Sequence, residues 1–180
     1  SSALPCLASF SKSTSPTRHA EASRAVAAID PTDFIARNLR LAPIPGFRAL
    51  QRYAPHPGSG LGRLAEQHGA SPYWAYLWSG GLALANWLTE NPAEIAGRRA
   101  LDYGTGSGLV ALVAARSGAA NVTGIDSDPF ARAAAILNAA ANGLEIDVVA
   151  TPPEPADFDM VLAGDVFYDA IAARTSLTIL

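Results

Sequence analysis

The feature that most constrains this chain is a glycine-rich loop, residues 104–108, set between a predicted strand and a predicted helix. The short apolar segment 100–103 comes before the loop, and an apolar segment suited to a helix, 109–116, follows it. The same alternation continues with strands over 121–125, 146–150 and 158–163 and a helix over 128–141. Strands and helices that alternate with short links predict an α/β fold with an open, mostly parallel sheet and helices on both faces.

The loop has two interpretations. Residues 102–108 read D-x-G-x-G-x-G, in which Asp102 ends the strand and Gly104 closes it. The rival frame, Gly106-x-Gly108-x-x-Ala111, matches the dinucleotide fingerprint, but its first glycine would come two residues late. The first frame also explains Asp102, because in adenosylmethionine sites such an acid faces the positively charged amino-acid end of the cofactor. A carboxylate at this place would repel a pyrophosphate.

Asp126 is the second fixed point, because it ends the second predicted strand of the alternating region. An acid there accepts hydrogen bonds from both ribose hydroxyls of a nucleoside cofactor. Asp128, followed by Pro129, is the better cap for the next helix, which leaves Asp126 free for the ribose. NAD and adenosylmethionine both carry this ribose, so Asp126 does not distinguish between them.

Composition narrows the classes of partner. The chain has 180 residues, a net charge of −3 and one cysteine, Cys6. Neither nucleic acid nor a membrane surface is expected as a partner, and no apolar run approaches the ~18 residues of a transmembrane helix. The three histidines share no metal-ligand spacing, so no metal site is expected.

The chain divides into three predicted regions: a flexible tail over 1–29, a helical and loop extension over 30–90, and an α/β core over 91–180. Within the extension, helices are expected from Asp30 to about Asn38, over 61–68, and over 80–89. Residues 1–18 hold basic residues but no acid, which fits a disordered tail or a transit peptide. The first interpretation predicts a cytoplasmic protein, and the second predicts the mitochondrial matrix.

Three segments, 72–81, 101–108 and 164–169, together resemble the electron-transfer-flavoprotein β-subunit lysine methyltransferases. That group belongs to the class I, seven-strand methyltransferases with a Rossmann-like sheet, and is related to the ribosomal protein L11 methyltransferases. The resemblance implies S-adenosyl-L-methionine as cofactor and a protein lysine as methyl acceptor, with the flavoprotein β subunit as the candidate substrate. It implies that the cofactor lies against these residues: Trp78, Gly80, Asp102, Gly104, Thr105, Gly106, Gly108 and Asp126.

Asp165 and Tyr168 match an Asp-x-x-Tyr motif at the end of the fourth strand, and the resemblance makes them the catalytic pair. Asp165 would orient the substrate amine and Tyr168 would shape its channel. The alternative for Asp165 is a cap on a helix over 166–174. Trp74 and Trp87 are predicted to be core residues, whereas Trp78 suits the core and the cofactor site equally. A structural hydrogen bond is expected of Asn138.

Two departures from the family pattern bear on activity. The family has an acidic or polar residue after the third strand that contacts the adenine, and Thr151 and Asp157 are poor substitutes for it. Only 12 residues follow Tyr168, so the sheet lacks its last strands, and self-association through an exposed apolar edge is expected. Three functions remain open: a lysine methyltransferase, an inactive cofactor-binding remnant of one, and an NAD-dependent oxidoreductase.

Overall fold

A computed structural model describes residues 29–153 and 157–166 of the chain. Four parallel strands form its main sheet in the order β5-β4-β3-β6. Their bounds are Arg99–Tyr103 for β3, Asn121–Ile125 for β4, Asp147–Val149 for β5 and Met160–Ala163 for β6. The predicted α/β fold class with a parallel sheet is therefore confirmed. The order reverses between β3 and β6, and open α/β sheets bind ligands at such a reversal.

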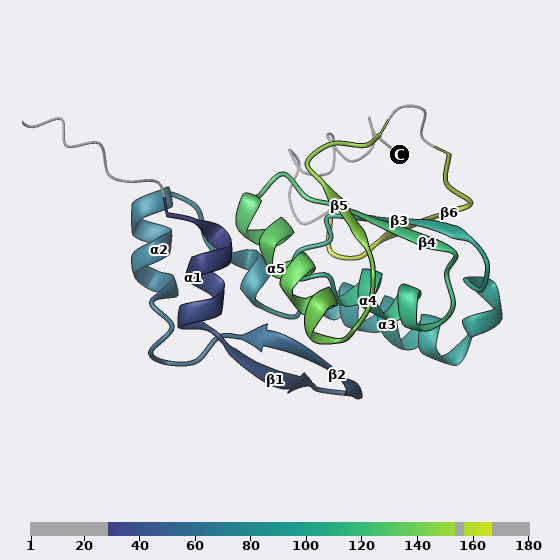
Figure 1. Cartoon of the computed structure of the whole chain (residues 1–180), viewed down its shortest axis with the longest axis horizontal. Coiled ribbons are helices and arrows are strands. Elements are labelled where there is room, and N and C mark those ends of the chain that lie inside the picture. The colour runs from purple at the N-terminus through teal and green to yellow at the C-terminus, as the bar shows by residue number, and fades with distance from the viewer. Residues whose placement is uncertain (1–28, 154–156, 167–180) are drawn as a thin grey trace, which may run out of the picture.

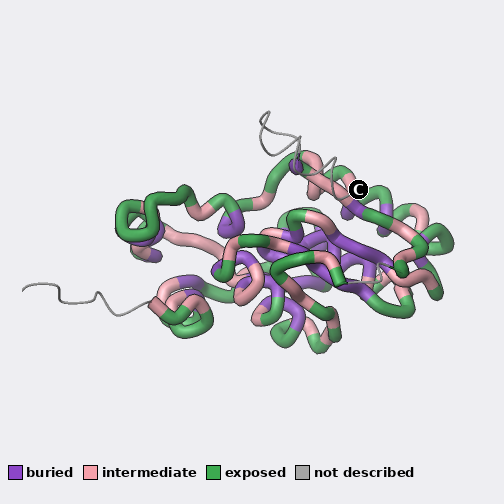
Figure 2. Tube along the Cα trace, turned by 90° about the horizontal axis from the view of Figure 1, so that it is seen from above, coloured by how far each residue is buried: buried purple, intermediate pink, exposed green. Residues whose placement is uncertain are grey.

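Three helices lie on one side of this sheet: α3 (Ser79–Glu90), α4 (Leu109–Arg116) and α5 (Pro129–Ala141) (Figure 1). Both crossovers, β3-α4-β4 and β4-α5-β5, step in the same direction along the sheet, so right-handed connections place both helices on one face. The central strands β3 and β4 and the helix α4 are buried over most of their length, whereas β5 is not (Figure 2). The main core joins strand residues Ala100, Val122 and Leu162 to the apolar side chains of α4.

The extension before the sheet contains a β-hairpin that the sequence analysis did not predict. Strands β1 (Arg40–Ile44) and β2 (Phe47–Ala54) pair antiparallel around Pro45 and Gly46. Two-residue turns join hairpin strands, but Pro43 within β1 argued against a strand. The hairpin tolerates Pro43 because β1 pairs on one side only, with β2.

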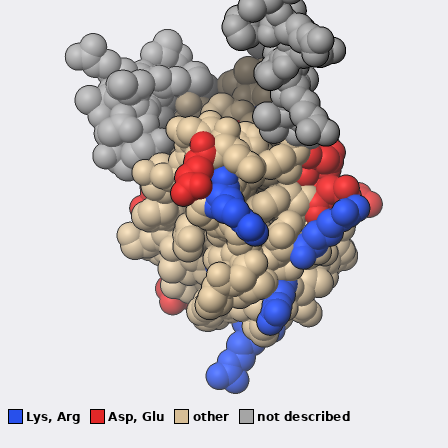
Figure 3. All heavy atoms as spheres, turned by 90° about the vertical axis from the view of Figure 1, so that its left-hand side faces the viewer, with Lys and Arg blue, Asp and Glu red and all other residues tan. Residues whose placement is uncertain are grey.

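The predicted helices of the extension are confirmed as α1 (Pro31–Asn38), α2 (Leu61–His68) and α3. Short 3-10 turns, η1 (Tyr73–Ala75) and η2 (Pro92–Glu94), precede and follow α3. On the side that carries α1 and α2, the basic side chains stand apart rather than forming one patch (Figure 3). Arg37 pairs with Asp33 at 3.2 Å. Within residues 29–153 and 157–166, every helix is too short or too polar to cross a bilayer.

The predicted burial of the tryptophans is half right. Trp74 is buried and stacks on Phe130 of α5, with ring centroids 6.0 Å apart. Trp87 is 41% exposed, so its predicted place in the core is wrong. It lies on the outer side of α3, because the neighbouring positions Ala85 and Leu88 face the core. Apolar residues dominate this helix, and the pattern therefore does not identify its buried stripe.

Arg99 ties together the amino ends of the sheet. Its guanidinium forms ion pairs with Asp157 and Asp159, which precede β6. The Asp159 carboxylate also accepts a hydrogen bond from the Arg99 backbone N–H at 2.8 Å. These contacts hold the start of β6 against the start of β3. Asp157 therefore lies at the end of the sheet opposite the glycine loop.

Replacing Gly108 with alanine should destabilise the fold. Gly108 has a φ of +86°, and a Cβ there would lie 3.1 Å from the Cα and Cβ atoms of Ala135. Left-handed strain of about 1–2 kcal/mol adds to the crowding of α5, so we expect a loss of roughly 2–4 kcal/mol of unfolding free energy. Denaturant titration measures it. Gly143→Ala is the control, because Gly143 has a φ of +63° but open space around it. Equal losses in the two variants would contradict close packing at Gly108.

Candidate active site

The carboxyl ends of three strands bring the predicted site residues to one edge of the sheet. Gly104 follows β3, Asp126 follows β4 and Asp165 follows β6. A Cβ on Gly104 would lie 2.7 Å from a methyl carbon of Val166, the residue after Asp165. The glycine loop and the chain after β6 are therefore in contact. Tyr168 and Phe167 lie outside the described residues.

Asp102 lies beneath the glycine loop. Its carboxylate is 2% exposed, and its Oδ2 atom accepts hydrogen bonds from the Thr105 hydroxyl at 2.6 Å and the Ala111 N–H at 3.1 Å. Burial raises the pKa of Asp102 to about 6, against the lowering effect of those two donors. The structure thus shows Asp102 joining the loop to the first turn of α4. The predicted contact with the cofactor stays a prediction.

Asp126 holds the other side of the loop. Its Oδ2 atom accepts the Gly106 N–H at 3.0 Å, and its Oδ1 atom accepts the Asp128 N–H at 2.9 Å. Burial raises the pKa of this carboxyl group as well, while the two N–H donors lower it. Asp128 caps α5, since its side chain accepts the Phe130 N–H at 2.8 Å. The predicted cap at Asp128 is therefore confirmed. Asp126 is not free in the sense expected, because both of its carboxylate oxygens accept backbone N–H groups, and its predicted contact with a ribose stays a prediction.

Asp165 lies against the start of α3. Its Oδ2 atom accepts the Gly81 N–H at 2.8 Å. The carboxylate, which follows β6, therefore caps the amino end of α3. A Cβ on Gly80 would lie 2.8–2.9 Å from the carboxyl atoms of Asp165. Gly80 therefore leaves the space that this carboxylate occupies. Asp165 nevertheless remains exposed to solvent.

Two aromatic side chains, Tyr73 and Trp78, precede the glycines that contact this carboxylate. Trp78 is 46% exposed, and its indole N–H donates to the Tyr73 carbonyl at 3.0 Å. The Tyr73 and Trp78 rings meet edge to face with centroids 5.7 Å apart. Trp78 is thus not a core residue, which leaves the alternative expected for it, the cofactor site. Its role there stays a prediction.

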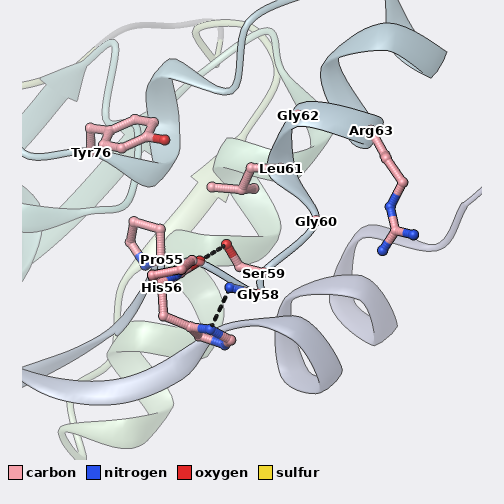
Figure 4. Close-up of a pocket in the computed structure, with 10 residues that line it drawn as sticks. Pro55, His56, Gly58, Ser59, Gly60, Leu61, Gly62, Arg63 and Tyr76 are labelled. Carbon is pink, nitrogen blue, oxygen red and sulfur yellow. Dashed lines mark hydrogen bonds between the residues drawn. The ribbon is translucent and has the colours of Figure 1, made fainter.

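A surface hollow of about 680 Å³ lies between residues 55–63 and Tyr76. Two hydrogen bonds shape its wall: the Ser59 hydroxyl donates to the His56 carbonyl at 2.8 Å, and the Gly58 N–H donates to His56 Nδ1 at 3.1 Å (Figure 4). Of the ten residues that line it, none is a predicted site residue. Among the residues that the structure describes, no three His, Cys, Asp or Glu side chains gather as a metal site.

Two residues near the site were not singled out as site residues. Asn138 is fully buried and donates to the Ser107 carbonyl of the loop at 2.8 Å, which confirms the structural hydrogen bond expected of it. Arg52 of β2 is 9% exposed and donates to the Ala75 carbonyl at 2.8 Å. No sequence signal pointed to Arg52, because arginines are usually exposed. Recognising the hairpin turn at Pro45 and Gly46 would have placed it on a strand.

The fold is an open α/β sheet with a glycine loop and three aspartates near the carboxyl ends of its strands, and comparisons with known proteins narrow its class. Residues 86–172 match the family model described as ribosomal protein L11 methyltransferase (PrmA). The electron transfer flavoprotein beta subunit lysine methyltransferase of Mus musculus is 41% identical over 104 residues, which cover 56% of this chain and 41% of that protein. The ribosomal protein L11 methyltransferase of Geobacter sulfurreducens is 47% identical over 75 residues, 41% of this chain and 25% of that protein.

A ribosomal protein L11 methylase structure from Lactobacillus delbrueckii subsp. bulgaricus superimposes with a TM-score of 0.44 and 30% identity, over 49% of this chain and 47% of that one. The chain spans about two fifths of the length of the flavoprotein-subunit methyltransferases that it matches. The resemblance inferred from the sequence is confirmed: the chain is related to both of these methyltransferase groups.

The buried carboxyl group of Asp102 should make stability depend on pH. Its pKa is about 6 in the folded chain and near 3.8 unfolded, so the folded state binds more protons between these values. Stability therefore falls as pH rises from 4 to 6, by on the order of 3 kcal/mol for this group. Denaturant titrations of the wild type and Asp102→Asn at pH 4, 5, 6 and 7 measure it. The wild type should lose stability relative to the variant across this range, and parallel curves would contradict the assignment.

Adding a methyl group at Gly80 should displace the Asp165 carboxylate. Alanine is favoured over glycine within helices by about 1 kcal/mol, so Gly81→Ala, which meets no atom closer than 3.9 Å, should stabilise the protein. Gly80→Ala should instead destabilise it by about 1–2 kcal/mol through overpacking. Thermal unfolding of both variants tests this. Adding Asp165→Ala to Gly80→Ala should recover stability, and a double variant less stable than either single one would contradict the clash.

Proposed function

We propose that this chain is the cofactor-binding part of an S-adenosylmethionine-dependent methyltransferase that acts on a protein lysine. The observation that carries the proposal is that two carboxylates contact the glycine loop. Asp102 lies under the loop, and Asp126 occupies its Gly106 N–H. In a dinucleotide site the N–H groups of this loop bind pyrophosphate. Two carboxylates suit the positively charged sulfonium cofactor and oppose a pyrophosphate, so adenosylmethionine is favoured over NAD.

Asp126 is the group best placed for the cofactor ribose. It stands at the carboxyl end of β4, the neighbour of β3, and the strand order reverses on the other side of β3. Acids at this position accept hydrogen bonds from ribose hydroxyls. The loop that joins β3 to α4 contains Thr105, Gly106 and Gly108. Its glycines allow the backbone to approach a ligand closely, which suits the methionine end of the cofactor.

Asp165 is the group best placed for the acceptor. Its exposed carboxylate stands at the carboxyl end of β6 and accepts the Gly81 N–H in the first turn of α3, and Trp78 is the residue directly before this helix. A carboxylate attracts an incoming lysine ammonium, and aromatic faces suit a methylated one. The relatives named as lysine methyltransferases of the electron transfer flavoprotein β subunit support a protein lysine. That subunit is the first candidate substrate.

The reaction is an in-line displacement. The lysine ammonium first loses a proton to water, and the neutral amine nitrogen attacks the methyl carbon. The nitrogen–carbon bond forms as the carbon–sulfur bond breaks, and S-adenosylhomocysteine leaves with the electron pair. Alignment of amine, methyl and sulfur supplies much of the rate in such a reaction. Asp165 is therefore assigned the role of orienting the amine rather than that of general base.

Calorimetric titration with S-adenosylhomocysteine tests the cofactor site. We expect micromolar binding to the wild type, a loss of about tenfold or more in Asp126→Ala because its ribose hydrogen bonds are lost, and little change in Asp128→Asn. The control variant removes a neighbouring charge but keeps a good helix cap. Affinity for S-adenosylmethionine should rise from pH 5 to 7, because the Asp102 carboxyl group, whose pKa is about 6, ionises over this range. Binding of NADH without binding of S-adenosylhomocysteine would overturn the proposal.

Transfer of a labelled methyl group from S-adenosylmethionine to purified flavoprotein β subunit tests the acceptor. Asp165→Asn keeps the shape of the side chain but removes its charge, so we expect at least about tenfold slower transfer with unchanged cofactor binding. A labelled methyl group that the wild type transfers to a lysine of the β subunit would support a protein lysine as the acceptor. Cofactor binding without transfer to any protein lysine would contradict it and would favour the inactive remnant.

A further inference from the structure

Strand β2 touches two separate walls of the proposed cofactor site through consecutive residues. The Arg52 side chain donates to the Ala75 carbonyl at 2.8 Å. The backbone N–H of the next residue, Tyr53, donates to Asn138 Oδ1 at 2.7 Å. One contact reaches η1, and the other reaches α5.

The first wall is η1, which lies over the glycine loop. Trp74, next to Ala75, has its Cα atom 3.9 Å from the place where a Cβ of Gly106 would lie. Trp74 is itself fixed by stacking on Phe130. The height of η1 above Gly106 therefore sets how much room the loop has on that side.

The second wall is the glycine loop itself, and Asn138 connects β2 to it. The amide of Asn138 accepts from Tyr53 through its oxygen and donates to the Ser107 carbonyl at 2.8 Å through its nitrogen. Both halves of one fully buried amide are thus used. A shift of β2 must move Ser107 or leave a buried polar group without its partner, which is costly.

Holding η1 through Arg52 requires the burial of a charged guanidinium group, which costs free energy. Its side chain is 9% exposed, and burial lowers the pKa of its guanidinium. Within residues 29–153 and 157–166, no carboxylate lies within 4.0 Å of it as an ion-pair partner. A buried cation without a counter-charge contributes poorly to stability, so its placement is better explained by the geometry that it fixes.

We infer that β2 is a brace for the cofactor site. Arg52 and Asn138 are positioning residues: Arg52 fixes η1, Asn138 fixes Ser107, and together they set the separation of the two walls. The inference rests on the proposed function, since it assigns these residues to the same site. It makes the hairpin of the extension a working part of cofactor binding.

The chain supplies a matched control for each residue. Asn142, one turn after Asn138, accepts the Gln51 N–H at 2.8 Å and donates to the Gln51 carbonyl at 2.7 Å. It holds the same strand, and its side chain also donates to the Asn138 carbonyl at 2.7 Å, but within the described residues it forms no hydrogen bond to the glycine loop. Arg48 is exposed on the same strand as Arg52.

The experiment measures S-adenosylhomocysteine affinity by calorimetry at a temperature where thermal unfolding shows each variant folded. Asn138→Asp keeps the acceptor for Tyr53 but turns the donor into a carboxylate facing the Ser107 carbonyl, and about tenfold weaker binding is expected. Asn142→Ala should lower the melting temperature but change affinity by less than about twofold. Arg52→Gln should weaken binding as Asn138→Asp does, and Arg48→Gln should not. Equal affinity losses within either pair would overturn the brace.

Amide hydrogen exchange separates this inference from the proposed function. The Thr105 and Gly108 amides are bonded within the loop region, to the Ile125 and Thr105 carbonyls. Asn138→Asp should speed their exchange by about tenfold or more, and Asn142→Ala should leave it unchanged. If the wild type binds no adenosylmethionine derivative, the proposed function fails and exchange alone decides on the brace at Asn138. If Asn138→Asp does not fold, the Arg52 and Arg48 pair decides, with exchange at the same amides.

Discussion

The buried carboxylate of Asp102 is the contact on which the rest of the site depends. It lies next to the last residue of β3, and it accepts hydrogen bonds from both the Thr105 hydroxyl of the loop and the Ala111 N–H of α4. Strand, loop and helix therefore meet at one oxygen atom. Hydrogen bonds to a buried charge are among the strongest in proteins. They compensate for part of the cost of removing this charge from water, which is the cause of its raised pKa.

Around this contact the loop is held by short polar links rather than by packing alone. Asp126 holds Gly106, Asn138 holds Ser107, and the Thr105 N–H donates to the Ile125 carbonyl at 2.9 Å. The extension before the sheet takes part in this arrangement. Its side chains Ile44, Phe47 and Leu50 share one hydrophobic cluster with α4 and the strands. A rigid loop has less freedom to lose when a ligand orders it.

The sequence predicted the α/β region well because its signals are local. Glycines punctuate it, Asp128 and Pro129 start α5, and the helix over 109–116 agrees with α4 at both ends. The hairpin was not predicted because prolines such as Pro43 and Pro45 usually interrupt strands, whereas here pairing with β2 stabilises β1. Trp87 was placed in the core because α3 is apolar on most of its surface.

The site could be predicted only as a set of positions. Motif spacing placed Asp126, Asp165 and the loop glycines at strand ends, and the strand order brings them to one edge. Spacing carries no information on contacts between distant segments. The bonds from Asp165 to Gly81 and from Tyr53 to Asn138 join residues 84 and 85 positions apart, so they depend on tertiary packing that the sequence alone does not reveal.

The two ends of β3 carry charged groups of different kinds, and the ion pairs of Arg99 lie at its amino end. Its amino end carries an exposed cluster of one arginine and two aspartates, and its carboxyl end carries the candidate active site. Salt screens exposed pairs of this kind, which contribute little to stability, whereas the buried carboxylates are shielded from salt. The amino end is thus free to drift in evolution, or to be redesigned for a saltier or hotter setting, without disturbing chemistry at the far end of the same strand.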